Sequence, residues 1–107
     1  MTTQAPQPGS NPAYSVIPKI AELTSSLLFG EIWERPQLSK RDRSMITVAV
    51  LTALYRTDQL RGHMRRALAN GVTREELAEI VTHITFYSGW PCGVNAGSVL
   101  KEVLEEG

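Results

Sequence analysis

Cysteine is nearly absent from this sequence, and its scarcity excludes several kinds of site. The chain of 107 residues holds a single cysteine, Cys92, which has no second cysteine with which to form an intramolecular disulfide. Neither a CxxC motif nor a Cys/His spacing typical of zinc occurs. We therefore expect no metal site.

An excess of charge of either sign is also lacking. Eleven basic and eleven acidic residues leave no formal net charge at pH 7. A balanced chain has no strong non-specific attraction to nucleic acid or to an anionic membrane. We therefore expect neither of them as a partner.

Long apolar segments are missing as well. No run approaches the ~20 apolar residues that span a bilayer. The first residues, MTTQAPQPGSNP, have neither the basic nor the apolar region of a secretion signal. We expect a cytoplasmic protein with a disordered tail at residues 1–12 and one domain at residues 13–107. A core of this size is modest, which favours homo-oligomerisation.

From Tyr14 onward, apolar residues recur at spacings of three and four, the period of an amphipathic helix. The first helix is expected to end near Gly30, because glycine often follows a helix C-terminus. Pro36 then stops any continuation. The apolar positions of this helix are Val16, Ile17, Ile20, Leu23, Leu27 and Leu28.

Ser39, with Asp42 three residues later, resembles a capped helix start. The stretch MITVAVLTAL, residues 45–54, is apolar around most of a helical wheel. This pattern predicts a central helix that is enclosed by others.

Asp58 is the expected cap of the third helix, and Asn70-Gly71 is its expected end. The apolar stripe of this helix is Leu60, His63, Met64, Ala67 and Leu68.

TREE, residues 73–76, is a complete capping box and predicts the start of a fourth helix. Gly89 breaks that helix, Pro91 suits a first helical position, and residues 94–104 form a fifth. The inward positions of the fourth helix are Leu77, Ile80, Val81, Ile84 and Ser88. The sequence therefore predicts an all-α fold of about five helices.

Several of these segments together resemble one protein family. They are WERPQLSKRDRSMITVAVLTAL, LRGHMRRALANGVTREELAEI, HITFYSGWP and the Asn-Ala that follows. Their order and spacing are similar to those of the carboxymuconolactone decarboxylase family, within the alkylhydroperoxidase D-like superfamily, over roughly residues 27–106. The resemblance implies a helical bundle that assembles as a trimer or hexamer, with active sites walled by helices.

The superfamily offers two chemistries, and the first is a peroxidase with a CxxC motif four residues before a histidine. If that histidine corresponds to His63, the two cysteine positions fall at Arg56 and Gln59, which have no sulfur. The disulfide cycle needs both sulfurs. Cys92 alone leaves a one-Cys peroxidase that depends on an external thiol.

The second chemistry is decarboxylation without a cofactor. It needs a cation to hold a carboxylate and an acid to reprotonate carbon. The resemblance assigns these roles to Arg43, His63 and His83, with His63 moving the proton and His83 assisting. Lactone decarboxylases also carry a segment like Gly-Asp-x-His-Val. Nothing similar occurs among residues 1–30, so the exact reaction stays open.

Several other residues can be interpreted either as parts of a functional site or as purely structural residues. We expect the substrate pocket to be lined by Trp90, Tyr87, Trp33 and Cys92. The structural alternative is that the aromatic residues pack in a core or an interface and that the free cysteine packs as a small hydrophobe. Cys92 lies near a helix start, where the dipole favours a thiolate. Arg41 is expected on the plain surface. Arg56 and Arg61 could equally form salt bridges between subunits.

The sequence therefore predicts an enzyme, a cofactor-free carboxy-lyase. Its expected substrate is a small carboxylated compound, either unsaturated or a lactone. Two alternatives remain: a one-Cys, thiol-dependent peroxidase that uses Cys92, and a non-enzymatic helical oligomer that binds a ligand.

Overall fold

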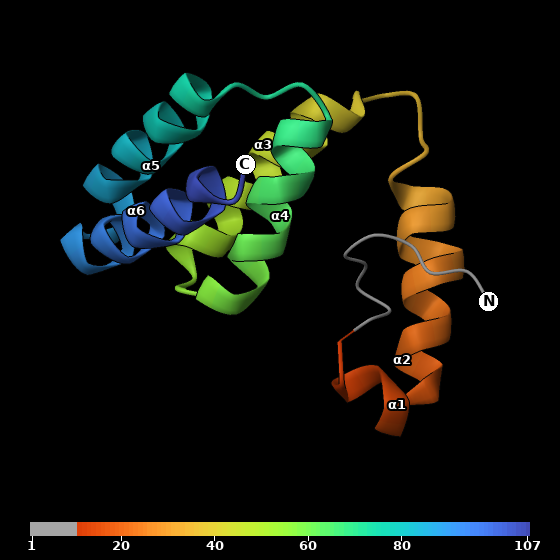
Figure 1. The fold of residues 1–107 in the computed structure, drawn as a ribbon. Coiled ribbons are helices and arrows are strands. Elements are labelled where there is room, and N and C mark those ends of the chain that lie inside the picture. The colour runs from red at the N-terminus through yellow and green to blue at the C-terminus, as the bar shows by residue number, and fades with distance from the viewer. Residues whose placement is uncertain (1–10) are drawn as a thin grey trace. The chain divides into compact units, whose positions relative to one another are not determined.

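The computed structural model describes residues 11–107, which hold six α-helices and one π-helix and no strand (Figure 1). This confirms the predicted all-α class. The chain divides into two compact units, the first ending at Leu38 and the second running from Ser39 to Gly107. The predicted tail at residues 1–12 falls mostly on residues 1–10, which lie outside the described residues. In the described part of the chain, no helix combines the length and apolarity needed to cross a membrane.

The first unit contains α1 (Ala13–Val16), α2 (Pro18–Leu23) and the π-helix η2 (Thr24–Ile32). The predicted first helix is therefore interrupted at Ile17, and it ends at Ile32, two residues past the predicted Gly30. Pro18 has no backbone N–H, so it begins α2 instead of continuing α1. Gly30 lies inside η2, where a Cβ atom would stand 2.8 Å from the carbonyl oxygen of Ser25. The helix continues past Gly30 because its backbone has the wider π-helical winding.

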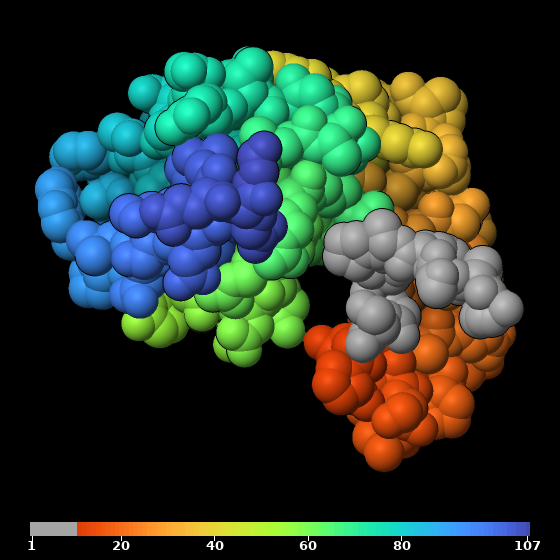
Figure 2. All heavy atoms as spheres, in the orientation of Figure 1, coloured from red at the N-terminus to blue at the C-terminus, as the bar shows by residue number. Residues whose placement is uncertain are grey.

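The second unit is a bundle of α3 (Lys40–Ala53), α4 (Thr57–Ala69), α5 (Arg74–Ser88) and α6 (Trp90–Glu105). Both α4 and α5 pack against α3 and against α6, so α3 and α6 occupy opposite corners of the bundle. Figure 2 shows α6, in dark blue, lying against the green α4 and the teal α5. The helices therefore form two hairpins, α3–α4 and α5–α6, stacked around one core.

Short-range capping sets most of these helix ends. Ser39 accepts a hydrogen bond from the Asp42 backbone N–H at 3.0 Å, as predicted. Thr73 and Glu76 form the predicted capping box. Asn70 is the C-cap of α4, and Gly71 has the left-handed φ of 97° that ends such a helix.

The predicted cap of α4 is wrong. Arg56 precedes the helix as its N-cap residue, and Asp58 lies inside the first turn. A carboxylate in that turn still interacts favourably with the helix dipole.

The core of the bundle lies where the four helices meet. Its buried apolar side chains are Val48, Leu60, Met64, Ala67, Val72, Leu77, Val81, Ala96, Val99, Leu100 and Val103. The prediction that α3 is enclosed on most sides is wrong for the described chain, since Ile46 and Val50 remain 51% and 48% exposed. Only one face of α3 is buried.

Pro91 lies in the first turn of the last helix, as predicted, although this helix begins four residues before the predicted range 94–104. Gly89 has a φ of 106° and separates α5 from α6, which starts at Trp90 with Pro91 in its first turn. Gly93 is buried where α6 crosses Thr85 of α5. The short connection therefore makes α5 and α6 a tight hairpin (Figure 1).

Candidate functional site

One flank of α4 faces α6, and the ion pairs that two α4 arginines form with glutamates at the C-terminal end of the chain identify this flank. Arg61 donates to Glu102 at 2.8 Å, and Arg65 pairs with Glu106 at 2.7 Å. The sequence left open whether Arg61 forms a salt bridge between subunits. In this structure its carboxylate partner belongs to the same chain.

The opposite flank of α4 faces α3. The side-chain amide of Asn70 donates to the Ser44 hydroxyl at 3.0 Å. Arg66 lies one turn before Asn70, and His63 lies one turn before Arg66. Because positions three, four and seven apart share a helix face, both side chains lie on the flank that contacts α3.

Arg43 is a cation of α3, the helix that faces this flank of α4. It directly precedes Ser44, and its carbonyl oxygen accepts a hydrogen bond from the Thr47 hydroxyl at 2.8 Å. Arg43, His63 and Arg66 are all half-buried. We call the line of Arg43, His63, Arg66 and the Asn70–Ser44 pair the α3–α4 seam.

Burial controls the protonation of His63 in this seam. Burial and, to a smaller extent, the positive charge of Arg66 together lower the pKa of His63 from 6.5 to about 4. Burial also lowers the pKa of the Arg66 guanidinium. At neutral pH, His63 is therefore a neutral imidazole beside a cation.

A groove lies on the other flank of α3, where that helix meets α5. It has a volume of about 420 Å³ and is mainly apolar. Its lining residues are Met45, Ile46, Ala49, Glu76, Glu79, Ile80, His83 and Ile84. We call it the α3–α5 groove.

His83 contributes the imidazole of this groove. Glu79, one turn earlier on α5, lines the groove beside it. The Tyr87 ring, one turn later, lies 4.9 Å from the His83 ring between centroids. The sequence-predicted face of Glu79, His83 and Tyr87 therefore exists, and its first two members border the groove.

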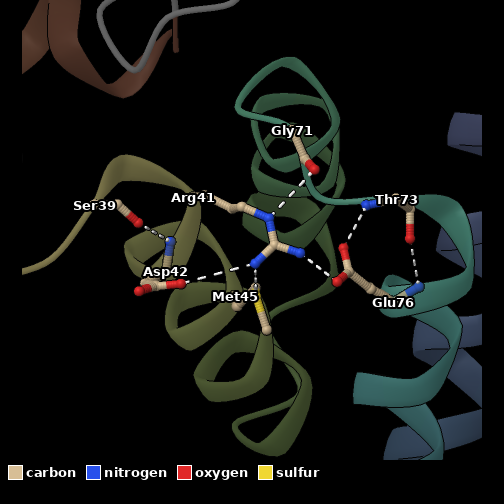
Figure 3. A network of polar contacts seen from close by, with 7 residues as sticks. All are labelled: Ser39, Arg41, Asp42, Met45, Gly71, Thr73 and Glu76. Atoms are coloured by element: carbon tan, nitrogen blue, oxygen red, sulfur yellow. Dashed lines mark hydrogen bonds and ion pairs between the residues drawn. The ribbon is translucent and has the colours of Figure 1, made fainter.

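Figure 3 shows how Arg41 connects α3 to the start of α5. Its guanidinium pairs with Glu76, donates to the Gly71 carbonyl at 3.4 Å and contacts the Met45 sulfur at 3.4 Å. The expectation that Arg41 is plain surface is therefore wrong, because it binds Glu76 of α5 and Gly71 of the α4–α5 connection as well as Met45 of its own helix.

Glu76 has two structural partners at this point. The backbone N–H of Thr73 donates to one carboxylate oxygen, and the Arg41 guanidinium binds the other. These contacts lower the pKa of Glu76, the Thr73 hydrogen bond most. Its carboxylate thus stays charged at the end of the groove and holds the helix start in place.

The structure separates the two predicted histidines. His63 and Arg43 lie along the α3–α4 seam, whereas His83 lies in the α3–α5 groove on the other flank of α3. The seam carries the charges of two arginines, and the groove carries two glutamates. A carboxylate ligand is therefore attracted to the seam and repelled from the groove.

The other predicted pocket residues are distributed around the chain. Trp90 is 59% exposed, packs edge-on against Phe86 and lines a smaller groove between α5 and α6. Tyr87 is exposed on α5. Cys92 is half-buried in the first turn of α6, with its sulfur 3.7 Å from the Ala53 carbonyl. Trp33 belongs to the first unit and stacks on Phe29.

Sequence reasoning missed Arg66 and the apolar wall of the groove. Arg66 follows His63 by three positions, and that spacing could have marked it as a neighbour on the same face. The groove joins residues of α3 and α5 that lie 27 to 39 positions apart, for which no local signal exists. Among residues 11–107, no three His, Cys, Asp or Glu side chains gather as metal ligands would.

Comparison with known proteins identifies relatives along most of the chain. It is 43% identical to 4-carboxymuconolactone decarboxylase of Acinetobacter baylyi over 82 residues, which are 77% of this chain and 61% of that protein. It is 32% identical to nitrosuccinic acid decarboxylase of Metarhizium robertsii over 85 residues, 79% of this chain and 59% of that protein. The chain thus spans about three fifths of the length of these two relatives.

A third relative is an uncharacterised 15.0 kDa protein of Paracoccus denitrificans, 28% identical over 93 residues, 85% of this chain and 69% of that protein. The model of the carboxymuconolactone decarboxylase family matches residues 18–102. The match takes in α2, η2 and all of α3 to α5, together with the seam and the groove. The chain belongs to the carboxymuconolactone decarboxylase family.

Proposed function

We propose that this chain decarboxylates a small carboxylated substrate at the α3–α4 seam. The observation that carries the proposal is the half-buried His63 on the flank of α4 that contacts α3, with the half-buried Arg43 next to Ser44 on α3. Two relatives named as decarboxylases support the reaction class. An unsaturated or lactone compound is the substrate we expect.

The names of these relatives point to a shared chemistry. Nitrosuccinic acid carries a nitro group, and 4-carboxymuconolactone carries an unsaturated lactone. Each group can accept the electron pair that remains when the bond to a carboxyl carbon breaks. A substrate with such a group needs no cofactor as an electron sink. The protein must only bind the substrate, orient it and protonate the carbon that loses CO2.

In the proposed reaction, Arg43 binds a substrate carboxylate through paired N–H donors. The carbon–carbon bond to the departing carboxylate breaks, CO2 leaves, and its bonding electrons move into the conjugated group. His63 then delivers a proton to the carbon that lost CO2 and regains one from water.

The low pKa of His63 is consistent with that role once substrate is present. The imidazole is neutral at pH 7 because it is buried beside a cation. A bound carboxylate adds negative charge next to it, which raises its pKa and favours the protonated form. Substrate binding would thus favour protonation of His63, so that its imidazole can act as the acid of the reaction.

His83 is proposed as an assisting residue, and its position makes that role testable. It lies in the α3–α5 groove, so it would act on a substrate in the seam only indirectly. Tyr87 of α5, Trp90 and Cys92 of α6, and Trp33 of the first unit remain proposed substrate contacts.

We also propose that the chain acts as a homo-oligomer, a trimer or a hexamer. The exposed apolar residues Ile46 and Val50 on α3, and Phe86 on α5, support association. Light scattering would determine the number of copies.

The test is CO2 release from 4-carboxymuconolactone and from nitrosuccinate. We expect His63→Gln to lose about 10²–10⁴-fold in rate, the usual contribution of a positioned acid. His83→Gln serves as the matched control on α5 and should lose far less. Equal rates for wild type and His63→Gln would remove His63 from the mechanism. No release by wild type from either compound would remove these two substrates.

A further inference from the structure

The α3–α5 groove has acidic residues towards one end and apolar walls. Glu76 and Glu79 lie in the first two turns of α5, and both line the groove. The apolar wall continues along α5 with Ile80 and Ile84, which are half-buried. On α3 it includes the half-buried Ala49. A ligand that fits this groove therefore needs an apolar body and one polar end.

Glu76 is not the carboxylate that such a ligand would bind. Both of its oxygens have partners within the chain, because the Thr73 N–H donates to one and the Arg41 guanidinium binds the other (Figure 3). The charge of Arg41 is thus paired with that of Glu76 at this end of the groove. Among the described residues that line the groove, none is a lysine or an arginine.

Glu79 has different surroundings from Glu76. It is exposed, and within residues 11–107 its carboxylate forms no hydrogen bond and no ion pair. His83 lines the groove one turn later, and positions four apart share a helix face. Because Glu76 already balances Arg41, the charge of Glu79 stays uncompensated beside an apolar wall. This combination favours a ligand that carries a positive charge.

We propose that the α3–α5 groove binds a small organic cation, a primary ammonium on an apolar body. The ammonium donates to the Glu79 carboxylate, and the body lies against Ala49, Ile80 and Ile84. An ammonium has three N–H donors, so a second one can reach a ring nitrogen of unprotonated His83. The groove volume of about 420 Å³ lies within the usual range of small-molecule sites, about 300–1,000 Å³.

This site is separate from the one proposed for decarboxylation. That reaction takes a carboxylate substrate, and the two glutamates of the groove repel a carboxylate. The inference therefore goes beyond the proposed function and does not rest on it. A chain that releases no CO2 can still bind the cation, and a chain that binds no cation can still release CO2.

The experiment titrates the full chain with hexylammonium, 1-hexanol and heptanoate, three probes that share a hexyl body and differ in charge. Binding is followed by NMR through the methyl resonances of Ile80 and Ile84. In wild type at low salt, hexylammonium should bind at least about threefold more tightly than hexanol, and heptanoate should bind most weakly. The advantage of the ammonium should shrink at about 1 M salt, which screens exposed charges.

The apolar wall is tested with ethylammonium, which keeps the charge but has a shorter body. It should bind at least about tenfold more weakly than hexylammonium, because each buried methylene adds to the affinity. Ala49→Leu narrows the groove and should weaken hexylammonium and hexanol alike. Ala78→Leu, at an exposed position of α5 outside the groove lining, is the matched control and should leave both unchanged.

Glu79→Gln tests the charge. It keeps the size of the side chain, and it should abolish the preference for hexylammonium over hexanol. Glu75→Gln removes one exposed acid from the same helix outside the groove lining, so it should keep the preference. Far-UV circular dichroism of each variant verifies that the helices are intact.

Three results would overturn the inference. The first is a wild type that binds hexanol or heptanoate as tightly as hexylammonium, and the second is a Glu79→Gln variant that keeps the wild-type preference. The third is a wild type that binds none of the probes, which is the result expected if a second copy of the chain closes the groove.

Discussion

Gly93 of α6 lies against Thr85 of α5 so closely that a Cβ atom at position 93 would stand 1.9 Å from the Thr85 hydroxyl oxygen. The hydroxyl is held there by its own hydrogen bond to the Val81 carbonyl, at 2.7 Å. The two helices of the hairpin can thus approach this closely only because position 93 has no side chain.

Gly93→Ala should therefore destabilise the bundle, by about 1–3 kcal/mol, the usual cost of overpacking a core. Gly97, one turn later on α6, has nothing within 4 Å of the position a Cβ would take. Gly97→Ala is the matched control and should instead gain about 0.5–1 kcal/mol from improved helix propensity. Urea unfolding followed by circular dichroism measures both, and effects of the same sign would contradict the proposed close contact.

The helix ends illustrate which parts of the fold could be predicted from sequence. Ser39 with Asp42, and Thr73 with Glu76, are contacts between residues three apart, so the pattern carries all the information needed. The π-helical winding around Gly30 has no comparable local signature. Asp58 has the right chemistry for a cap, but the helix begins at Thr57 and its N-cap position falls two residues before Asp58, at Arg56.

Acid should weaken the Arg41–Glu76 contact in a defined pH range. The folded-state pKa of Glu76 is lowered from 4.5, so its contribution to stability is fully present above about pH 4.5. It is lost as the pH falls through the lower, folded-state value. Glu76→Gln keeps an oxygen for the Thr73 N–H but removes the charge that binds Arg41.

Wild type should thus be more stable than Glu76→Gln at pH 6, and the difference should shrink towards pH 3. Thermal unfolding across this range is the measurement. The lowered pKa of Glu106 is present in both proteins and cancels in the comparison. A difference that stays constant from pH 6 to pH 3 would contradict a role for the Glu76 charge.

His63 should impose a second pH dependence, at higher pH. Its folded-state pKa of about 4 lies below the ordinary 6.5, so the unfolded chain binds a proton more readily. Stability is full above pH 6.5 and falls as the pH drops towards 4. The partly exposed side chain limits the loss to on the order of 2 kcal/mol.

Urea unfolding of wild type and His63→Gln between pH 7.5 and pH 4.5 tests this. The slope of stability against pH should be smaller in His63→Gln than in wild type. His83→Gln also removes one imidazole but keeps His63, so it should retain the larger slope. Equal slopes in wild type and His63→Gln would show that His63 protonates as easily in the folded protein as in the unfolded chain.

The candidate site was harder to predict than the helices, because it depends on which flank of α3 each neighbour covers. Helical periodicity places His63 and His83 on the faces of their own helices but does not say that α4 and α5 cover different sides of α3. Arg41 and Glu76 meet across 35 positions, and no sequence spacing reveals such a pair. The seam therefore emerges only when the packed bundle is known.

A substitution of Cys92 distinguishes the proposed decarboxylase from a redox protein with the same fold. Its sulfur lies 3.7 Å from the Ala53 carbonyl, a weak contact between the start of α6 and the end of α3. The chain has no second thiol that could resolve a sulfenic acid on Cys92. Cys92→Ser keeps a group of similar size at the proposed substrate contact, and the proposed proton transfer belongs to His63, so CO2 release should stay far closer to that of wild type than to that of His63→Gln. Peroxide consumption with dithiothreitol should be the same for wild type, Cys92→Ser and His63→Gln. If that consumption instead disappears in Cys92→Ser and persists in His63→Gln, the chemistry of this chain is that of a one-Cys peroxidase.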